Sequence, residues 1–200
     1  GTASPIKPVL SRLLGLPRHA ASWLQARAGG PQDPGLSPEE TRSHFGAWAI
    51  VSSPLTLSHD VWDDDVSEKI WPVIANTEVL GVNQAYDGDS GGVYESSSVM
   101  TVHTDSFIEA NDATPKVLSP SYQYLYKPIG SGKVAVLLMN SGNSTATLTA
   151  DFSKIPGVMC GAVGNECNVR DIWNHKDLGA FATSWSGPVE SHDAAFLVIQ

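Results

Sequence analysis

The sequence of 200 residues predicts an α/β segment followed by an all-β domain. Residues 36–84 show the apolar spacing of helices interrupted by one short apolar run, which is the rhythm of an α/β fold and in particular of the closing part of a (β/α) barrel. Residues 85–92 are small, polar and rich in glycine, as expected for a domain boundary. Residues 93–200 contain short alternating segments joined by Gly, Asn and Ser turns, which is typical of an antiparallel sheet or sandwich.

The composition excludes several classes of protein. The chain is 42% hydrophobic and 16% charged, with a formal net charge of −9. An excess of acidic residues argues against nucleic-acid binding, because neutralising phosphates requires clustered Lys and Arg. No window approaches the roughly 18 uninterrupted apolar residues of a bilayer-spanning helix, so we expect no membrane insertion. Two cysteines cannot form a four-thiolate zinc site, and we expect neither a metal nor another cofactor.

Residues 1–35 differ from the rest of the chain in charge and in pattern. They contain four basic residues and a single acidic residue, and five prolines interrupt them. Their one apolar repeat, at residues 9–14, stops at Gly15 and Pro17 after little more than one turn. We therefore expect a poorly structured or foreign N-terminal segment, with a targeting segment as the alternative.

A helix is predicted to begin at Ser37. Ser37 is a favourable N-cap, Pro38 suits the first helical position, and Glu40 completes a capping box. The residues that recur at helical spacing and define one packed face are Thr41, Phe45, Trp48 and Ile50. Pro54 marks the end of this segment, because the residue before a proline favours extended geometry.

The α/β segment continues with a strand and a second helix. Residues 55–57 are predicted to form a short buried strand, and residues 59–65 an acidic loop. A second helix is expected at residues 66–74, with Val66, Ile70 and Ile74 in register. The aspartates of the loop lack the alternating spacing of a calcium-binding loop, so we interpret them as a solvated surface.

Short strands dominate the prediction after residue 93. The clearest segments are residues 99–102, 122–126, 133–139, 145–149 and 195–199. Tyr122, Tyr124 and Tyr126 alternate along one of them and would therefore point to the same face of a sheet. If that face is exposed, the three rings would form the aromatic strip of a carbohydrate-binding domain.

Cys160 and Cys167 are predicted to form a disulfide. Gly161 and Gly164 lie between them and permit a tight turn, and adjacent strands would bring the two Cα atoms within the roughly 4.4–6.8 Å that a disulfide allows. Two reduced, buried thiols are the alternative. A disulfide indicates an oxidising compartment. The acceptor sequence for N-glycosylation that begins at Asn143 points the same way.

Several strings of the sequence resemble the α-galactosidase (melibiase) family of glycoside hydrolases. In the first half these are HFGAWAIVSSPLTLS at 44–58 and NTEVLGVNQ at 76–84. In the second half they are QYLYKP at 123–128, VAVLLMN at 134–140 and VRDIWNHKDLG at 169–179. The strings occur in the family's order, and the resemblance covers residues 36–200.

The resemblance implies a fold and a reaction. Residues 36–84 would be the last strand and two helices of a (β/α)₈ TIM barrel, and residues 93–200 an antiparallel β-sandwich. The implied reaction is retaining hydrolysis of terminal α-linked galactose by two carboxylates. In the family both catalytic aspartates come from earlier barrel strands, so we expect no catalytic residue in this chain.

One residue before the helix is a candidate for contact with the sugar. The family carries a DPDML motif at the seventh strand, a few residues before the capping box. Asp33 and Pro34 resemble its start, whereas the second acid and the Met are absent. Asp33 is therefore a weak substrate-binding candidate, with a turn residue as the alternative.

One strand of eight cannot close a barrel, so we expect a truncated relative or an incomplete gene model. The faces of Phe45, Trp48, Ile70 and Ile74 should then be partly exposed and loosely held. Three functions follow: part of an α-galactosidase acting on galactose-containing oligosaccharides or glycoconjugates, a non-catalytic carbohydrate-binding or accessory β-domain, or a fragment without independent function. The expected location is secreted, vacuolar or lysosomal.

Overall fold

A computed structural model describes residues 36–57, 62–88, 90–104, 116–161 and 164–200. Its helices are α2 (Pro38–Ile50), α3 (Asp64–Ile74), α4 (Thr77–Gln84) and the short 3₁₀ helix η1 (Phe152–Lys154). Its strands are β1 (Gly92–Ser96), β2 (Met100–Thr104), β3 (Lys116–Pro120), β4 (Tyr122–Pro128), β5 (Val134–Asn140), β6 (Ala146–Asp151), β7 (Cys167–Asp171), β8 (Lys176–Phe181), β9 (Ser184–Val189) and β10 (Ala194–Ile199).

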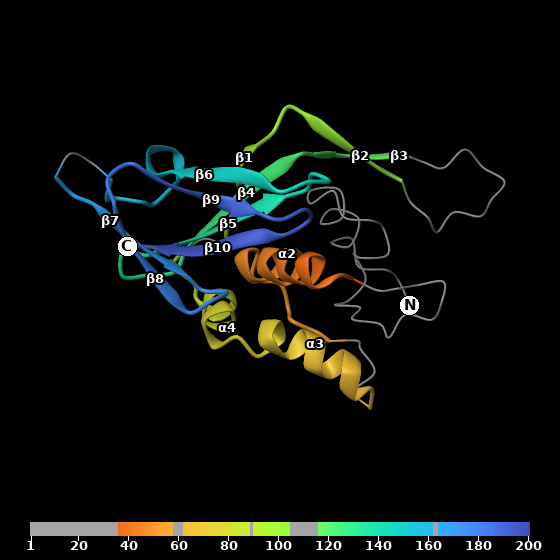
Figure 1. Ribbon diagram of the computed structural model, residues 1–200. Coiled ribbons are helices and arrows are strands. Elements are labelled where there is room, and N and C mark those ends of the chain that lie inside the picture. The colour runs from red at the N-terminus through yellow and green to blue at the C-terminus, as the bar shows by residue number, and fades with distance from the viewer. Residues whose placement is uncertain (1–35, 58–61, 89, 105–115, 162–163) are drawn as a thin grey trace.

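The strands form a large antiparallel sheet and two small ones. The large sheet has the order β1-β4-β5-β10-β7-β8, and the pairs β6–β9 and β2–β3 form the other two. The pair β2–β3 extends away from the other strands (Figure 1). Strand β10 pairs with β5 on one side and with β7 on the other, so the strands at the middle of the sheet are distant in sequence.

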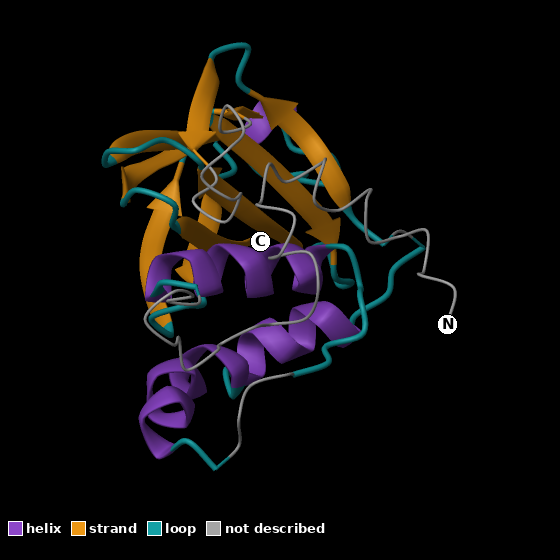
Figure 2. Cartoon of the chain, turned by 90° about the vertical axis from the view of Figure 1, so that its right-hand side faces the viewer, coloured by secondary structure: helices purple, strands orange, loops and turns teal. Residues whose placement is uncertain are grey.

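The large sheet is covered on both faces. One face packs on the pair β6–β9 through residues such as Val136, Leu138 and Leu197, which completes a β-sandwich. The opposite face packs on the helical layer through residues such as Leu137 and Phe196, with α2 lying directly on the sheet and α3 packed against α2. Figure 2 shows the longer helices gathered on one side of the strands. Because β5 is buried on both faces, its sequence is continuously apolar from Val134 to Met139 rather than alternating.

Helix α2 lies very close to the sheet. It begins as the sequence predicts: Ser37 Oγ accepts from Glu40 N at 3.1 Å, and Glu40 Oε2 accepts from Ser37 N at 2.8 Å. A Cβ atom built on Gly46 would lie 2.7 Å from Leu137 Cδ1 and 3.3 Å from Trp173 Cζ2. A side chain at position 46 would therefore require Leu137 or the helix to shift, so Gly46 allows this close spacing between helix and sheet.

Polar contacts also join the helices to the sandwich. Arg42 on α2 donates from Nε and Nη2 to the carboxylate of Asp193, at 2.9 and 2.5 Å. Arg170 on β7 donates to both oxygens of Glu78 on α4, at 2.7 and 2.9 Å. The buried Asn76 caps α4 and donates to the carbonyl of Ile172 at 2.7 Å. The helical layer is thus fixed to the sandwich by both apolar and charged contacts.

The expectation of partly exposed helical faces is wrong for three of its four residues, whereas Trp48 is partly exposed as expected. Phe45, Ile70 and Ile74 are 3%, 5% and 8% exposed, because the large sheet and the neighbouring helices cover them. The predicted strand at residues 55–57 is also wrong. Only Leu57 makes an isolated bridge, and it is 42% exposed. A strand requires neighbours to pair with, and a local apolar pattern cannot supply them.

Other elements differ from the sequence prediction. Helix α4 is an additional helix between the second predicted helix and the Gly-rich segment. Strands β1, β3, β7, β8 and β9 were not among the clearest predicted segments. The antiparallel β-sandwich itself is confirmed, whereas the barrel origin of residues 36–84 stays a prediction, as do the boundaries at 1–35, 36–84 and 93–200. The segment 1–35 lies outside the described residues.

Candidate functional site

The junction between the helices and the sandwich contains the most unusual polar group in the described residues. Lys127 lies near the end of β4 with its side chain fully buried. Its ammonium donates to the carbonyl oxygens of Val82 and Asn83, at 2.5 and 3.0 Å, and lies 3.5 Å from that of Ala49. These carbonyls belong to the last turns of α4 and α2, where helical carbonyls run out of intrahelical donors, and that of Ala49 also accepts from Ser52 N at 3.4 Å.

Burial lowers the pKa of Lys127, because desolvation disfavours the charged form. The C-terminal ends of two helices, which carry partial negative charge, favour that charge. Lys127 therefore links two helices to the sheet from inside the junction. It is a structural group rather than a catalytic one.

A groove of about 660 Å³ opens beside the junction. Arg42, Trp173, Trp185, Asp193 and Glu190 are among the residues that line it. Asp193 is bound to Arg42, which raises the pKa of that guanidinium, and Glu190 accepts from Thr145 Oγ1 at 2.5 Å. The lining carboxylates are thus engaged in contacts that hold the fold, and nothing in the groove marks an acid–base pair.

A second charged cluster joins α4 to the hairpin of β7 and β8. Glu78 accepts from Arg170 and lies 2.5 Å from His175 Nδ1, and Arg170 also donates to Asp177 at 2.8 Å. The hydrogen bonds from Arg170, and then the contact with His175, lower the pKa of Glu78. This cluster also has a structural role, since it fixes α4 on the sheet.

The tyrosine strip predicted from β4 is not an exposed face. Tyr122, Tyr124 and Tyr126 point into the sandwich, where Tyr122 and Tyr124 stack with ring centroids 4.7 Å apart. Tyr94 packs edge-to-face on Tyr126, and burial raises the pKa of its hydroxyl. Because Tyr124 belongs to the core and Tyr122 and Tyr126 are partly buried against it, these rings give no support to a carbohydrate-binding face on this strand.

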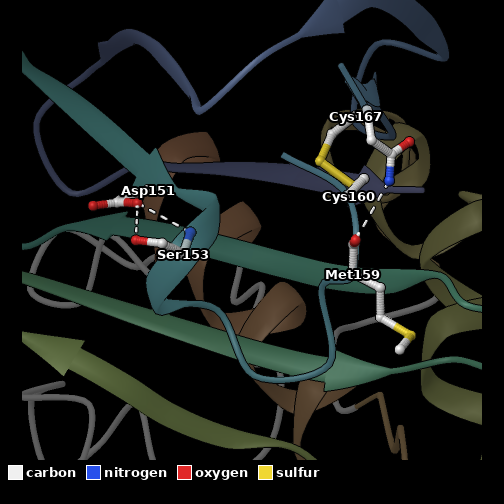
Figure 3. Close-up of a disulfide and its surroundings, with 6 residues drawn as sticks. Asp151, Ser153, Met159, Cys160 and Cys167 are labelled. Atoms are coloured by element: carbon white, nitrogen blue, oxygen red, sulfur yellow. Dashed lines mark hydrogen bonds between the residues drawn. A yellow bond between two sulfur atoms is a disulfide. The ribbon is translucent and has the colours of Figure 1, made fainter. Parts of the chain in front are cut away.

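The disulfide predicted between Cys160 and Cys167 is present, with Cα atoms 5.1 Å apart. It does not bridge two paired strands, because Cys167 begins β7 whereas Cys160 lies in the preceding loop (Figure 3). A Cβ atom on Gly161 would lie 3.1 Å from Phe152 Cβ, so the loop runs close over η1. The disulfide thus holds this loop against the sandwich.

The remaining predicted site residues are placed as follows. Asp33, the substrate-binding candidate, lies outside the described residues. Asn143 is exposed in the turn between β5 and β6. Within the described residues, no cluster of three or more His, Cys, Asp or Glu side chains could hold a metal ion. None of the described helices combines the length and apolar character needed to cross a membrane.

Sequence reasoning missed Lys127 and the two buried asparagines, Asn76 and Asn140. The alternation of β4 could have placed Lys127 on the face opposite the tyrosines, together with Gln123 and Leu125. Its partners lie more than forty residues earlier in the chain, so no local pattern indicates them.

Comparison with known proteins shows that the sequence is similar to alpha-galactosidases. Residues 119–199 match the family model of the alpha galactosidase C-terminal beta sandwich domain. The chain is 30% identical over 184 residues to an alpha-galactosidase of Cyamopsis tetragonoloba, and 29% identical over 165 residues to one of Coffea arabica. These alignments cover 87% and 82% of the chain but only 38% and 36% of the relatives. The chain therefore spans little more than a third of their length.

Solved structures agree in fold. Alpha-galactosidase I from Mortierella vinacea matches with a TM-score of 0.65 at 23% identity, over 90% of this chain and 38% of that one. An alpha-galactosidase from Saccharomyces cerevisiae, solved with raffinose, matches with a TM-score of 0.64 at 14% identity, over 90% and 46%. At these identities the similarity establishes the fold of the described layers.

Proposed function

We propose that this chain, which is related to the C-terminal part of the α-galactosidase family of glycoside hydrolases, is the non-catalytic part of an enzyme that hydrolyses terminal α-linked galactose. The observation that carries the proposal is the relationship over 87% of the chain, which extends beyond the sandwich into the residues that precede it. A relationship limited to an accessory sandwich would not include that region. The proposal therefore treats α2, α3, α4 and the sandwich as one inherited unit.

The chemistry would come from residues outside this chain. Retaining glycosidases use two carboxylates about 5–5.5 Å apart, one as nucleophile and the other as acid and then base. The charged residues at the helix–sandwich junction already bind each other. In the α-galactosidase family, which this chain resembles, both catalytic aspartates lie upstream of the corresponding region. Asp33 remains a proposed galactose contact, carried by its place in the sequence alone.

The role of the chain itself would be to support the catalytic part. Helix α3 buries Val66, Ile70 and Val73 toward the neighbouring helices, while Trp71 on the same helix is 63% exposed. Trp62, just before α3, is 90% exposed. Exposed apolar side chains that gather in one contiguous patch mark surfaces that bind other protein segments. We propose that the upstream part of the enzyme covers this side of α3 and completes the barrel.

A chimera tests the proposal directly. Residues 36–200 would replace the corresponding C-terminal part of the Cyamopsis tetragonoloba relative, and hydrolysis of p-nitrophenyl α-galactoside would be measured. We expect turnover by the folded chimera and none above a buffer blank by this chain alone. The upstream part of the relative, expressed alone, is the matched control and should be inactive or unstable.

Two results would contradict the proposal. Turnover by the isolated chain would place catalytic groups within it, and loss of that turnover in Asp33→Asn would identify Asp33 as one of them. Circular dichroism and a single elution peak would show that the chimera folds. A folded chimera without activity would contradict the proposed supporting role of residues 36–200. The transcript upstream of this chain supplies a separate check, since it should encode the two aspartates in frame.

The proposed location is the secretory route, leading to secretion or to a vacuole or lysosome. The support is the disulfide between Cys160 and Cys167, since such bonds persist in oxidising compartments. Fractionation of the source cells tests this location, and recovery of the chain in the cytosol with both thiols reduced would contradict it.

A further inference from the structure

The turn between β5 and β6 carries a modification signal that the proposed enzymatic role does not use. It contains Asn143-Ser144-Thr145, the only Asn-x-Ser/Thr sequence in the chain. All three residues are exposed. A glycan attached there would extend into solvent without displacing any core residue.

A neighbouring buried asparagine fixes the shape of this turn. Asn140 is 3% exposed, and its Nδ2 donates to the carbonyl oxygens of Ser144, Val189 and Glu190, each at 2.9 Å. Its Oδ1 accepts from Gly142 N at 2.9 Å. The turn is therefore anchored at its base by Asn140, while Asn143 lies at its exposed tip. The two asparagines differ in role although they are three residues apart.

The disulfide supplies a second observation, because it indicates an oxidising compartment, and the lumen in which N-glycosylation takes place is such a compartment. Cys160 and Cys167 are bonded within the same sandwich, and bonds of this kind form in the lumen of the secretory route. A chain that acquires this bond in that lumen is exposed there to the glycosylation machinery.

We propose that Asn143 is an N-glycosylation site whose donor is an oligosaccharide linked to a lipid pyrophosphate. In the transfer, the side-chain nitrogen of Asn143 forms a bond to the anomeric carbon of the first sugar. The bond between that carbon and the pyrophosphate oxygen breaks, the lipid pyrophosphate leaves with the bonding electrons, and the nitrogen loses one proton. The inference stands whether or not the proposed enzymatic role is correct.

The hydroxyl that completes the acceptor sequence has a partner in the folded chain. Thr145 Oγ1 donates to Glu190 Oε2 at 2.5 Å, and both side chains lie at the surface. A glycan on Asn143 would therefore remain on an exposed turn of the folded protein.

The test is expression of the full chain behind a cleavable secretion signal in a yeast, followed by peptide mapping before and after treatment with peptide N-glycosidase. We expect a glycopeptide at Asn143 that becomes an aspartate-containing peptide on treatment, under native as well as denaturing conditions. The variants Asn143→Gln and Thr145→Ala should lose the glycan. Thr145→Ser should keep it, because serine also completes the acceptor sequence.

A second exposed asparagine that lacks the acceptor sequence provides a matched control. Asn174 is also exposed but is followed by His175 and Lys176, so Asn174→Gln should leave the glycan unchanged. A secreted, disulfide-bonded chain with unmodified Asn143 would overturn the proposal. So would a glycan that persists in Asn143→Gln. Failure of Thr145→Ser to be modified while the parent chain is modified would overturn the assignment to this acceptor sequence.

Discussion

The ammonium nitrogen of Lys127 lies 2.5 Å from the carbonyl oxygen of Val82, although 45 residues separate them in sequence. One residue belongs to the sandwich and the other to the last turn of α4. Because a buried charge is tolerated only where its hydrogen bonds are made, this contact couples the helical layer to the sheet. The two layers should therefore lose their structure together.

Replacement of Lys127 by methionine should destabilise the chain strongly. It would remove a charged donor and leave the buried carbonyl of Val82 and the half-buried one of Asn83 without this partner, at a cost of about 3 kcal/mol. The free energy of unfolding in urea measures the effect. Lys133→Met, at an exposed position in the turn before β5, is the control and should change stability by less than about 0.5 kcal/mol. Equal effects of the two substitutions would contradict the role of Lys127.

Two helical glycines should respond to alanine in opposite directions. In Gly46→Ala the new methyl group would meet Leu137 Cδ1 at 2.7 Å, so the buried Leu137 side chain or α2 must shift, and we expect a loss of about 1–3 kcal/mol. In Gly81→Ala on α4 nothing lies within 4 Å, so we expect a gain of roughly 0.5–1 kcal/mol from helix propensity. Thermal unfolding of both variants checks this. A stabilising effect at Gly46 would show that the helix does not pack as closely as described.

The stability of the chain should fall in acid partly through Glu78. Its hydrogen bonds from Arg170 and its contact with His175 lower its folded pKa from the ordinary value of 4.5. A lowered folded pKa means that the stabilisation is complete above 4.5 and is lost as the pH falls through the folded value. Glu78→Gln should remove this part of the pH dependence, about 1 kcal/mol at neutral pH.

Melting temperatures between pH 7 and pH 3 measure that difference. Glu68→Gln, at an exposed position on α3, should keep the slope of the parent chain. An unchanged slope in Glu78→Gln would mean that the ion pair with Arg170 contributes nothing to stability.

Removal of the disulfide should weaken the sandwich without abolishing it. The bond closes a short loop between Cys160 and Cys167, so we expect the paired Cys→Ala variant to lose at most about 2–3 kcal/mol. Intact mass before and after reduction, with alkylation of the denatured chain, establishes the bond itself. Alkylation of both thiols without prior reduction would show that the bond does not form.

The sequence predicted features that depend on neighbouring residues. The capping box of Ser37 and Glu40 and the pairing of Cys160 with Cys167 are confirmed, because each involves atoms a few residues apart. The antiparallel sandwich is confirmed because turns and alternation recur along the chain. Residues 55–57 had the apolar character of a strand, yet a strand also requires partners.

Features that join distant parts of the chain were not predictable. The ion pair of Arg42 with Asp193 spans 151 residues, and nothing beside either residue signals it. The same holds for the contact of Gly46 with Leu137, which depends on how a helix lies on a sheet. For the candidate site, the alternation of β4 placed the tyrosines on one face but could not show that β6 and β9 cover that face.

The position of β10 between β5 and β7 has a consequence for biosynthesis. A ribosome completes β5 and β7 before it reaches β10, so both strands wait with an unpaired edge until the strand between them arrives. Contacts of such long sequence separation form slowly, and open apolar edges invite association with other chains. Nascent chains should therefore require chaperone protection over this interval. Translation errors within the six residues of β10 should cause more aggregation than errors in an edge strand of similar length.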